Sequence, residues 1–324
     1  MKALKTPLIS LLALLVLGSV FQFGFNPYIQ LTVQFIIVNA ILAMSLNLVS
    51  GFTGQFSLGH AGFMAIGAYT SAFLSTEFQT LFTGPLAFVA ISLATILGGL
   101  LAAAAGFLVG LPSLRLKGDY LAIVTLGFGE IIRVALLNME SLGGPRGISG
   151  IPSLPNFFTS YVYSALWALI CFFVIWRLIQ SSHGRGFLSV REDEIAAEAM
   201  GINTTQMKVR AFVLSSFFAG VAGSLFAHVT NYISPASFTY LMSVNAVIMV
   251  VLGGMGSMTG SIIAAIFITV LPEALRSLQT WTGVDLRMVI YSLLLILVMI
   301  LRPQGLFGEM EVTDLWRKYV RKSA

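Results

Sequence analysis

The sequence has very little formal charge. Of its 324 residues only 10% are Asp, Glu, Lys or Arg, whereas 57% are hydrophobic. A soluble domain usually has about 25% charged residues, which cover its surface. Charge is absent altogether over residues 6–76, 78–114, 147–176, 211–272 and 288–301, and an apolar run of about 18 residues can cross a bilayer as a helix. These absences exclude a soluble domain and predict an all-α polytopic membrane protein.

The sequence also lacks the residues of several kinds of site. Its single cysteine, Cys171, lies in a predicted span, so disulfides play no part in the expected fold. Walker A, HExxH and CxxC sequences, the usual parts for hydrolysing ATP or holding a catalytic metal, do not occur. The three histidines, His60, His183 and His228, are scattered along the chain. We therefore expect no enzymatic activity and no bound metal or cofactor.

Hydropathy predicts up to ten spans. They lie near 8–25, 29–50, 57–76, 85–111, 119–139, 160–180, 209–229, 239–252, 256–275 and 286–302. Eight full crossings with a re-entrant pair at 239–275 would give the same orientation, so both counts stay open. We expect the first span to be retained, because no convincing small-x-small cleavage site follows it.

Lys and Arg are unevenly distributed about these spans. With Lys2 and Lys5 inside, fourteen of the eighteen basic residues fall inside, three fall outside and Arg133 lies within a span. Basic residues collect on the cytoplasmic ends of spans. The distribution therefore predicts cytoplasmic termini and a cytoplasmic segment at 181–210, and it explains the net charge of +5 without a nucleic-acid partner.

Glycine and polar side chains interrupt the apolar pattern at "SGFTGQFSLGHAGF", residues 50–63. Each glycine in a helix interior costs about 1 kcal/mol relative to Ala. Backbone groups that such a break frees in a membrane must bond to protein or to water in a cavity. Two interpretations stay open: a cytoplasmic turn between two spans, or an unwound segment whose Gln55, Ser57 and His60 face a polar path.

A similar spacing occurs in the second half of the chain, in "LGGMGSMTG". Two glycine-interrupted segments in corresponding places point to a transport site at a repeat interface. We therefore predict hinges or broken helices at both places. The glycines assigned to them are Gly51, Gly54, Gly59, Gly253, Gly254 and Gly256.

Other patterns favour structural roles. Small residues over 98–110 and 215–224 predict closely packed helices. Glu130 and Arg133 are three residues apart, share a helix face and should form a neutralising pair; a proton relay is the weaker alternative. The Gly- and Pro-rich segment 141–156 is expected to be an external loop.

The cytoplasmic segment contains "REDEIAAEAMGIN", residues 191–203. Its acidic residues suit the first turn of a short helix, where the helix dipole favours negative charge, and Gly201 suits the helix end. The predicted apolar face consists of Ile195, Ala199 and Ile202. Such a helix either ties two spans together at the membrane surface or docks a soluble partner.

This segment resembles the cytoplasmic "EAA…G" loop of bacterial ABC importer permeases, which fits a groove on the ATPase. Ala196, Ala197 and Gly201 match its spacing, while Ile195 holds the leading Glu position and Glu194 lies one residue earlier. That departure is similar to the version in branched-chain amino-acid importer permeases of the LivM type. Four other stretches resemble the same family: "LNLVSGFTGQFSLGHAGFMAIGAY", "LRLKGDYLAIVTLGFGEIIR", "GGPRGISGIP" and "GGMGSMTGSIIAA". Together with the EAA-like segment they cover most of the chain after the first span.

The resemblance implies one permease domain over 1–324 in the bacterial inner membrane, with a coupling segment at 181–210 and a cytoplasmic tail at 303–324. It implies as partners two cytoplasmic ABC ATPase subunits that bind the ATP, a homologous LivH-like permease and a periplasmic or extracellular solute-binding protein. The implied ATPase-coupling residues are Glu192, Asp193, Glu194, Ala196, Ala197, Glu198 and Gly201. Relatives in this superfamily serve urea or short amides, so the solute stays open.

Such a subunit would work by alternating access, with the ATPases pushing on the helix near 192–201. A solute that arrives from a binding protein needs only a weakly binding path, lined by apolar and small residues and a few polar groups. The polar residues assigned to this path are Asn47, Gln55, Ser57, His60 and Asn245. A stand-alone ion-coupled transporter is the alternative from another class, and Glu130 is its candidate coupling residue. A membrane-embedded enzyme would need a cluster of His, Asp, Glu or Cys at one depth.

Overall fold

The computed structural model describes residues 26–84, 86–113, 116 and 118–276, together with Gly18 and scattered residues between 290 and 308. The predicted spans at 8–25 and 286–302 lie largely outside these residues, as does the predicted tail at 303–324. Apart from two short strands, the regular secondary structure of the described residues is helical. The all-α class predicted from composition is confirmed.

Helices occupy the eight predicted spans between the two ends of the chain. Five of them are long and apolar enough to cross a membrane: α2 (Pro27–Ser50), α5 (Ala87–Ser113), α6 (Asp119–Asn138), α7 (Phe157–Gln180) and α10 (Thr204–Thr230). α3 (His60–Glu77) has 18 residues, α11 (Tyr240–Gly253) has 14 and α12 (Met258–Ala274) has 17. A full crossing takes about 20 residues, so the pair α11 and α12 is shorter than its neighbours.

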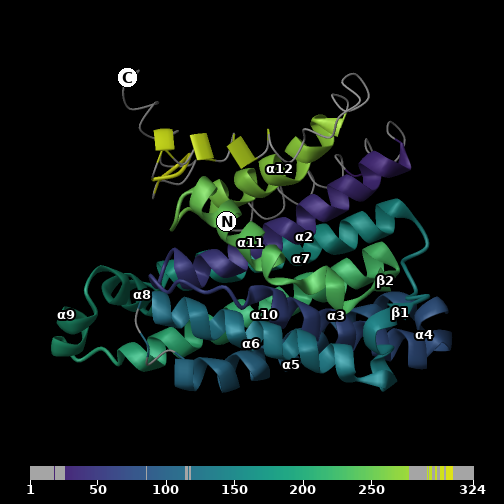
Figure 1. Cartoon of the computed structure of the whole chain (residues 1–324), viewed down its shortest axis with the longest axis horizontal. Helices are drawn as coiled ribbons and strands as arrows, with labels where there is room; N and C mark the ends of the chain where they lie inside the picture. The colour runs from purple at the N-terminus through teal and green to yellow at the C-terminus, as the bar shows by residue number, and fades with distance from the viewer. Residues whose placement is uncertain are drawn as a thin grey trace, which may run out of the picture.

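The centre of the bundle is α10, which packs against α2, α3 and α5 (Figure 1). The helices approach closely because glycines lie where they cross. A Cβ added to Gly220 would collide with Ala102 of α5, and one added to Gly223 would collide with the backbone of α3 at Met64. The predicted role of the small residues over 98–110 and 215–224 in close packing is confirmed.

The two ends of the bundle carry different connections (Figure 1). At one end lie α4 (Gln79–Thr83) and a two-stranded antiparallel sheet of β1 (Ile148–Ser149) and β2 (Tyr232–Ile233), in which Ile148 pairs with Ile233. Three 3-10 turns lie in the connections near it, η1 (Glu140–Leu142), η2 (Gly144–Arg146) and η3 (Pro235–Phe238). The predicted external loop at 141–156 is thus ordered by pairing with the connection after α10.

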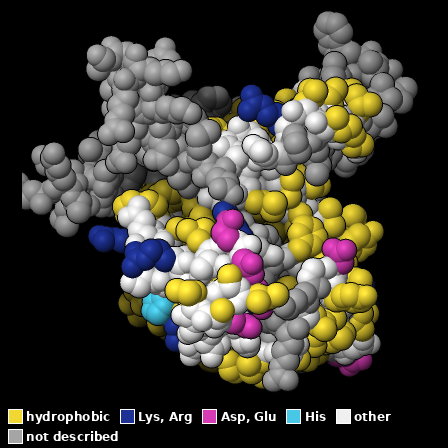
Figure 2. Space-filling view, turned by 90° about the vertical axis from the view of Figure 1, so that its left-hand side faces the viewer, with side chains coloured by type: hydrophobic (Ala, Val, Ile, Leu, Met, Phe, Trp, Pro, Cys, Tyr) yellow, Lys and Arg dark blue, Asp and Glu magenta, His cyan; other side chains and the backbone are white. Residues whose placement is uncertain are grey.

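The opposite end carries α8 (Ser182–Glu192) and α9 (Glu194–Ala199). Seen from this side, acidic and basic side chains gather over the end of the bundle, with hydrophobic side chains flanking them (Figure 2). The distribution of Lys and Arg predicts that this end faces the cytoplasm. Within α6, Arg133 Nε donates to Glu130 Oε2 at 2.7 Å, so the predicted pair is confirmed.

Candidate functional site

The two glycine-rich stretches meet at the α8–α9 end of the bundle. Residues 51–59, the first glycine turn, connect α2 to α3, and residues 254–257, the second glycine turn, connect α11 to α12. Gly54, Gly254 and Gly256 have φ values of 69°, 109° and 90°, which favour glycine. A Cβ on Gly51 would collide with the Gly256 backbone. The first stretch is therefore a turn between helices, as one of the two interpretations predicts, and its hinge role stays a prediction.

Asn47 ties the two turns together. Its side chain is fully buried in α2. Nδ2 donates to the Ser257 carbonyl and to Ser261 Oγ, both at 2.9 Å, while Oδ1 accepts from the Gly256 N–H at 2.9 Å. This amide is thus committed to holding the second glycine turn against α2. In this conformation both of its N–H donors are used within the protein.

His60 begins α3 and is buried at the junction of three helices. Its Nε2 hydrogen-bonds with Ser45 Oγ of α2 at 3.1 Å and Ser215 Oγ of α10 at 3.2 Å. Ser215 also donates to the Ser45 carbonyl. The start of α3 is held on a second side, because Ser243 Oγ of α11 accepts from the Ala61 N–H at 2.9 Å. The four helices α2, α3, α10 and α11 therefore converge on the end of the first glycine turn.

Unpaired buried polar atoms concentrate in and beside the first glycine turn. Within the described residues, the buried side-chain atoms without a hydrogen-bond partner are Ser50 Oγ, both amide atoms of Gln55, Ser57 Oγ, His60 Nδ1 and, elsewhere, Tyr69 Oη. An unsatisfied buried group costs about 1–3 kcal/mol. These atoms are therefore candidates for hydrogen bonds to water or to a polar solute.

The coupling segment differs from the prediction in its helix boundaries. We expected residues 192–194 to share the first turn of one helix. Instead Glu192 is the last residue of α8, and Asp193, with φ of −156°, separates it from α9. Asp193 Oδ1 accepts from the N–H groups of Ile195 and Ala196 at 2.9 and 3.1 Å. The chain breaks here because Asp is a favoured N-cap, and Gly201, with φ of 83°, follows the end of α9 as predicted.

Two acidic residues of α9 are engaged with the bundle. Glu194 Oε1 accepts from Lys208 Nζ of α10 at 2.6 Å, and the Lys208 side chain is only 8% exposed. Glu198 Oε1 accepts from Thr204 Oγ1 at 2.6 Å. Ala197 is buried, whereas Ile195 and Met200 are 74% and 83% exposed. Ile195 and Met200 therefore form an exposed apolar surface, here called the α9 tip. Glu194 and Glu198 bind the other side of the helix to α10.

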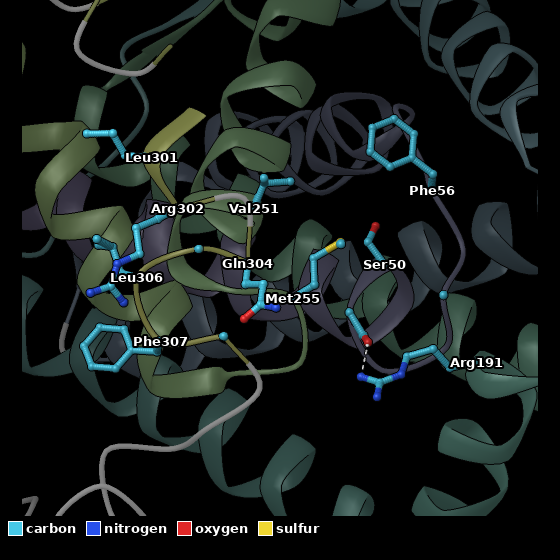
Figure 3. Close-up of a pocket in the computed structure, with 14 residues that line it drawn as sticks. Ser50, Phe56, Arg191, Val251, Met255, Leu301, Arg302, Gln304, Leu306 and Phe307 are labelled. Atoms are coloured by element: carbon cyan, nitrogen blue, oxygen red, sulfur yellow. Dashed lines mark hydrogen bonds between the residues drawn. The ribbon is translucent and has the colours of Figure 1, made fainter. Parts of the chain in front are cut away.

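A cavity of about 1200 Å³ opens between the two glycine turns and residues 301, 302 and 304–308. Figure 3 shows Phe56 and Arg191 on one side and Leu301, Arg302, Leu306 and Phe307 on the other, with Gln304 and Met255 between them. Arg191 Nη1 donates to the Gly51 carbonyl at 3.2 Å. Phe56 and Met255 are 39% and 47% exposed, so each glycine turn presents one large apolar side chain here.

The predicted path residues are not all brought together. Asn47, Gln55, Ser57 and His60 belong to the first glycine turn and the two helix ends beside it, whereas Asn245 is exposed on α11. Sequence reasoning missed Ser45, Ser215, Arg191 and Lys208. Two of their partners are local, Glu192 beside Arg191 and the Leu42 carbonyl near Ser45. The other partners lie between 14 and 170 residues away along the chain, and no local pattern identifies those contacts.

Comparison with known proteins gives a consistent family. The family described as "Branched-chain amino acid transport system / permease component" matches residues 28–299. The chain is 42% identical to the high-affinity branched-chain amino acid transport system permease protein LivM of Salmonella typhimurium, over 82% of this chain and 67% of that protein. It is 40% identical to LivM of Escherichia coli K12, over 91% of this chain and 74% of that protein.

The chain also matches LivH, a second kind of permease in these systems, at lower identity. The chain is 26% identical to the permease protein LivH of Salmonella typhimurium, over 84% of this chain and 92% of that protein. No solved structure gives a significant match. By the family match and the two LivM relatives, this chain belongs to the permease components of branched-chain amino acid transport systems and is of the LivM type.

Proposed function

We propose that the chain is the pore-forming subunit of an ATP-driven importer of branched-chain amino acids and moves its solute by alternating access. The relatives named for this solute support branched-chain amino acids over urea or short amides. The proposal that ATP drives transport rests on the form and exposure of α9. It is a short capped helix at the α8–α9 end whose tip is apolar and exposed, while its acidic side chain Glu194 is fixed to α10.

The proposed partners follow from the same features. Two cytoplasmic ATPases would dock on the α9 tip and hydrolyse ATP. A LivH-like permease would form the second half of the pore, and the match of this chain to LivH as well as LivM supports a pair of related subunits. A solute-binding protein would deliver the amino acid to the opposite end of the bundle, where the ordered connections around β1 and β2 lie.

The proposed solute path passes the first glycine turn. The unpaired buried atoms of Gln55, Ser57 and His60 support it, because an opening movement would let them meet water or the polar head group of an amino acid. Asn47 and Asn245 are weaker candidates: Asn47 is committed to the second glycine turn and Asn245 lies apart on α11.

Changing the tip of α9 tests the proposed docking. Ile195→Glu and Met200→Glu place a charge in what would become a buried contact, and loss of a central contact residue costs about 2 kcal/mol or more, roughly 30-fold in affinity. We expect the ATPase subunits to be lost from the purified complex while the permease still inserts. Co-purification of tagged permease with ATPase, quantified in detergent, measures this.

The control is Gln206→Glu, which adds the same charge at an exposed position near the start of α10. Glu194→Lys is a poor test by comparison, because it would also break the ion pair with Lys208. Undiminished recovery of ATPase with both tip variants would rule out docking at this helix.

The ion-coupled alternative makes an opposite prediction at Glu130. This carboxylate is paired with Arg133, and both side chains are partly exposed, at 30% and 25%. If ATP drives transport, Glu130→Gln should leave most of the ATP-dependent uptake in place, because the ATPases and not a proton bound at Glu130 then supply the driving force. Uptake of labelled leucine into proteoliposomes checks this. Uptake driven by a proton gradient without ATP, and abolished in Glu130→Gln, would favour the alternative.

A further inference from the structure

Arg191 is placed to move with the coupling segment. It is the penultimate residue of α8, followed by Glu192 and then by Asp193, the single non-helical residue before α9. The Asp193 side chain caps α9 through two backbone N–H groups. Only Asp193 separates the two helices, and its side chain caps α9. There is therefore little flexible chain to absorb a displacement of α9. A force on α9 therefore reaches the end of α8, where Arg191 lies.

The Arg191 side chain bonds to the first glycine turn and lies beside the second. Its Nη1 donates to the Gly51 carbonyl at 3.2 Å. A Cβ on Gly54 would lie 3.1 Å from Arg191 Cγ, and a Cβ on Gly256 would lie 3.1 Å from Arg191 Nη1. Side chains at these glycines would crowd the arginine, so their absence allows one guanidinium to reach the two turns at once. Figure 3 shows this side chain beside the cavity, joined to the Gly51 carbonyl.

The charge of Arg191 suits this position. Nε and Nη2 donate to Glu192 Oε1 at 3.0 and 2.6 Å, which leaves Nη1 for the Gly51 carbonyl. Gly51 is the C-cap of α2, and cations are favoured at helix C-termini. The planar fork of a guanidinium can serve a carboxylate and a carbonyl together, whereas the ammonium of lysine acts as a point charge. The Arg191 side chain is only 19% exposed, so the residues around it restrict its conformation.

We infer that Arg191 is the positioning residue that transmits displacement of α8 and α9 to both glycine turns, and so opens or closes the cavity between these turns and residues 301, 302 and 304–308. The inference rests on the proposed function, because it needs an ATPase to displace α9. Without the guanidinium, α9 can still dock the ATPase, since its tip is untouched. The glycine turns would then no longer follow it.

The test measures uptake of labelled leucine per ATP hydrolysed, in proteoliposomes that hold the complete complex with its cognate subunits. For Arg191→Ala we expect assembly and ATP hydrolysis within about twofold of wild type, and uptake per ATP about tenfold lower, in the usual range of coupling between sites. Arg191→Lys should be intermediate. Arg185→Ala is the matched control, because Arg185 is exposed on the same helix and, among the residues that the structure describes, its side chain bonds only to Ser182.

A second readout follows the glycine turn itself. Met255→Cys offers an exposed label site, and the native Cys171 is fully buried. We expect a fluorophore at position 255 to respond to ATP in the Arg191 protein and to lose that response in Arg191→Ala, even if assembly of this variant is reduced. A retained response, or uptake per ATP equal to wild type in both Arg191 variants, would overturn the inference. A wild-type complex without ATP-driven uptake would refute the proposed function, and the inference with it.

Discussion

Replacing Gly223 by alanine should destabilise the protein, although alanine is the better helix former. Gly223 lies in α10 where it crosses α3, and an added Cβ would meet the Met64 carbonyl and the Ala68 N–H of that helix. Backbone atoms inside a packed helix cannot step aside as a flexible side chain can. Overpacking of this kind costs about 1–3 kcal/mol, and we expect the upper end because α10 is the centre of the bundle.

Gly127→Ala is the matched control and should have the opposite sign. Gly127 lies within α6, and a Cβ there would have no heavy atom within 4 Å. Alanine is favoured over glycine in a helix by about 1 kcal/mol, so this variant should be more stable than wild type. Unfolding of both variants in detergent, followed by far-UV circular dichroism, measures the difference. Equal effects at the two positions would contradict the close crossing of α3 and α10.

Replacing Asn47 by aspartate should cost about 3 kcal/mol or more of stability. The change keeps the shape of the side chain but replaces Nδ2, which donates to the Ser257 carbonyl and to Ser261 Oγ, by an oxygen. The Ser257 carbonyl keeps its hydrogen bonds from Ser261 but then faces a buried negative charge in place of a donor. Removing one partner of a buried polar group costs about 1–3 kcal/mol, and more where charge is involved. The second glycine turn should detach from α2, and transport should fall with it.

Asn39→Asp is the control on the same helix. Within the described part of the chain, Asn39 Nδ2 donates only to Thr269 Oγ1 of α12, at 2.9 Å and in a partly buried place. A threonine hydroxyl can rotate and donate to a carboxylate instead, so the cost should be about 1 kcal/mol or less. Detergent unfolding and leucine uptake are measured for both variants. If Asn47→Asp changed uptake but not stability, Asn47 would belong to the solute path, as its sequence position suggests.

The sequence allowed the membrane class, the helix positions and several contacts to be predicted. The apolar runs are long, and helix positions follow from them because every span must satisfy its backbone hydrogen bonds internally. Glu130 and Arg133 were predictable because their pairing is local, three residues apart on one helix. The acidic segment that ends at Gly201 was recognisable, but not its break at Asp193, because an aspartate suits both a first helical turn and an N-cap.

The sequence by itself therefore determined local features: apolar helices, glycine turns and a charged segment on one side of the membrane. Only the tertiary structure decided that the two glycine turns touch, that Asn47 holds them together and that Arg191 reaches both. These contacts join residues 140 or more positions apart or depend on the space that a missing Cβ leaves. Periodicity and composition describe each segment separately, and which segments meet is set by how their surfaces fit together.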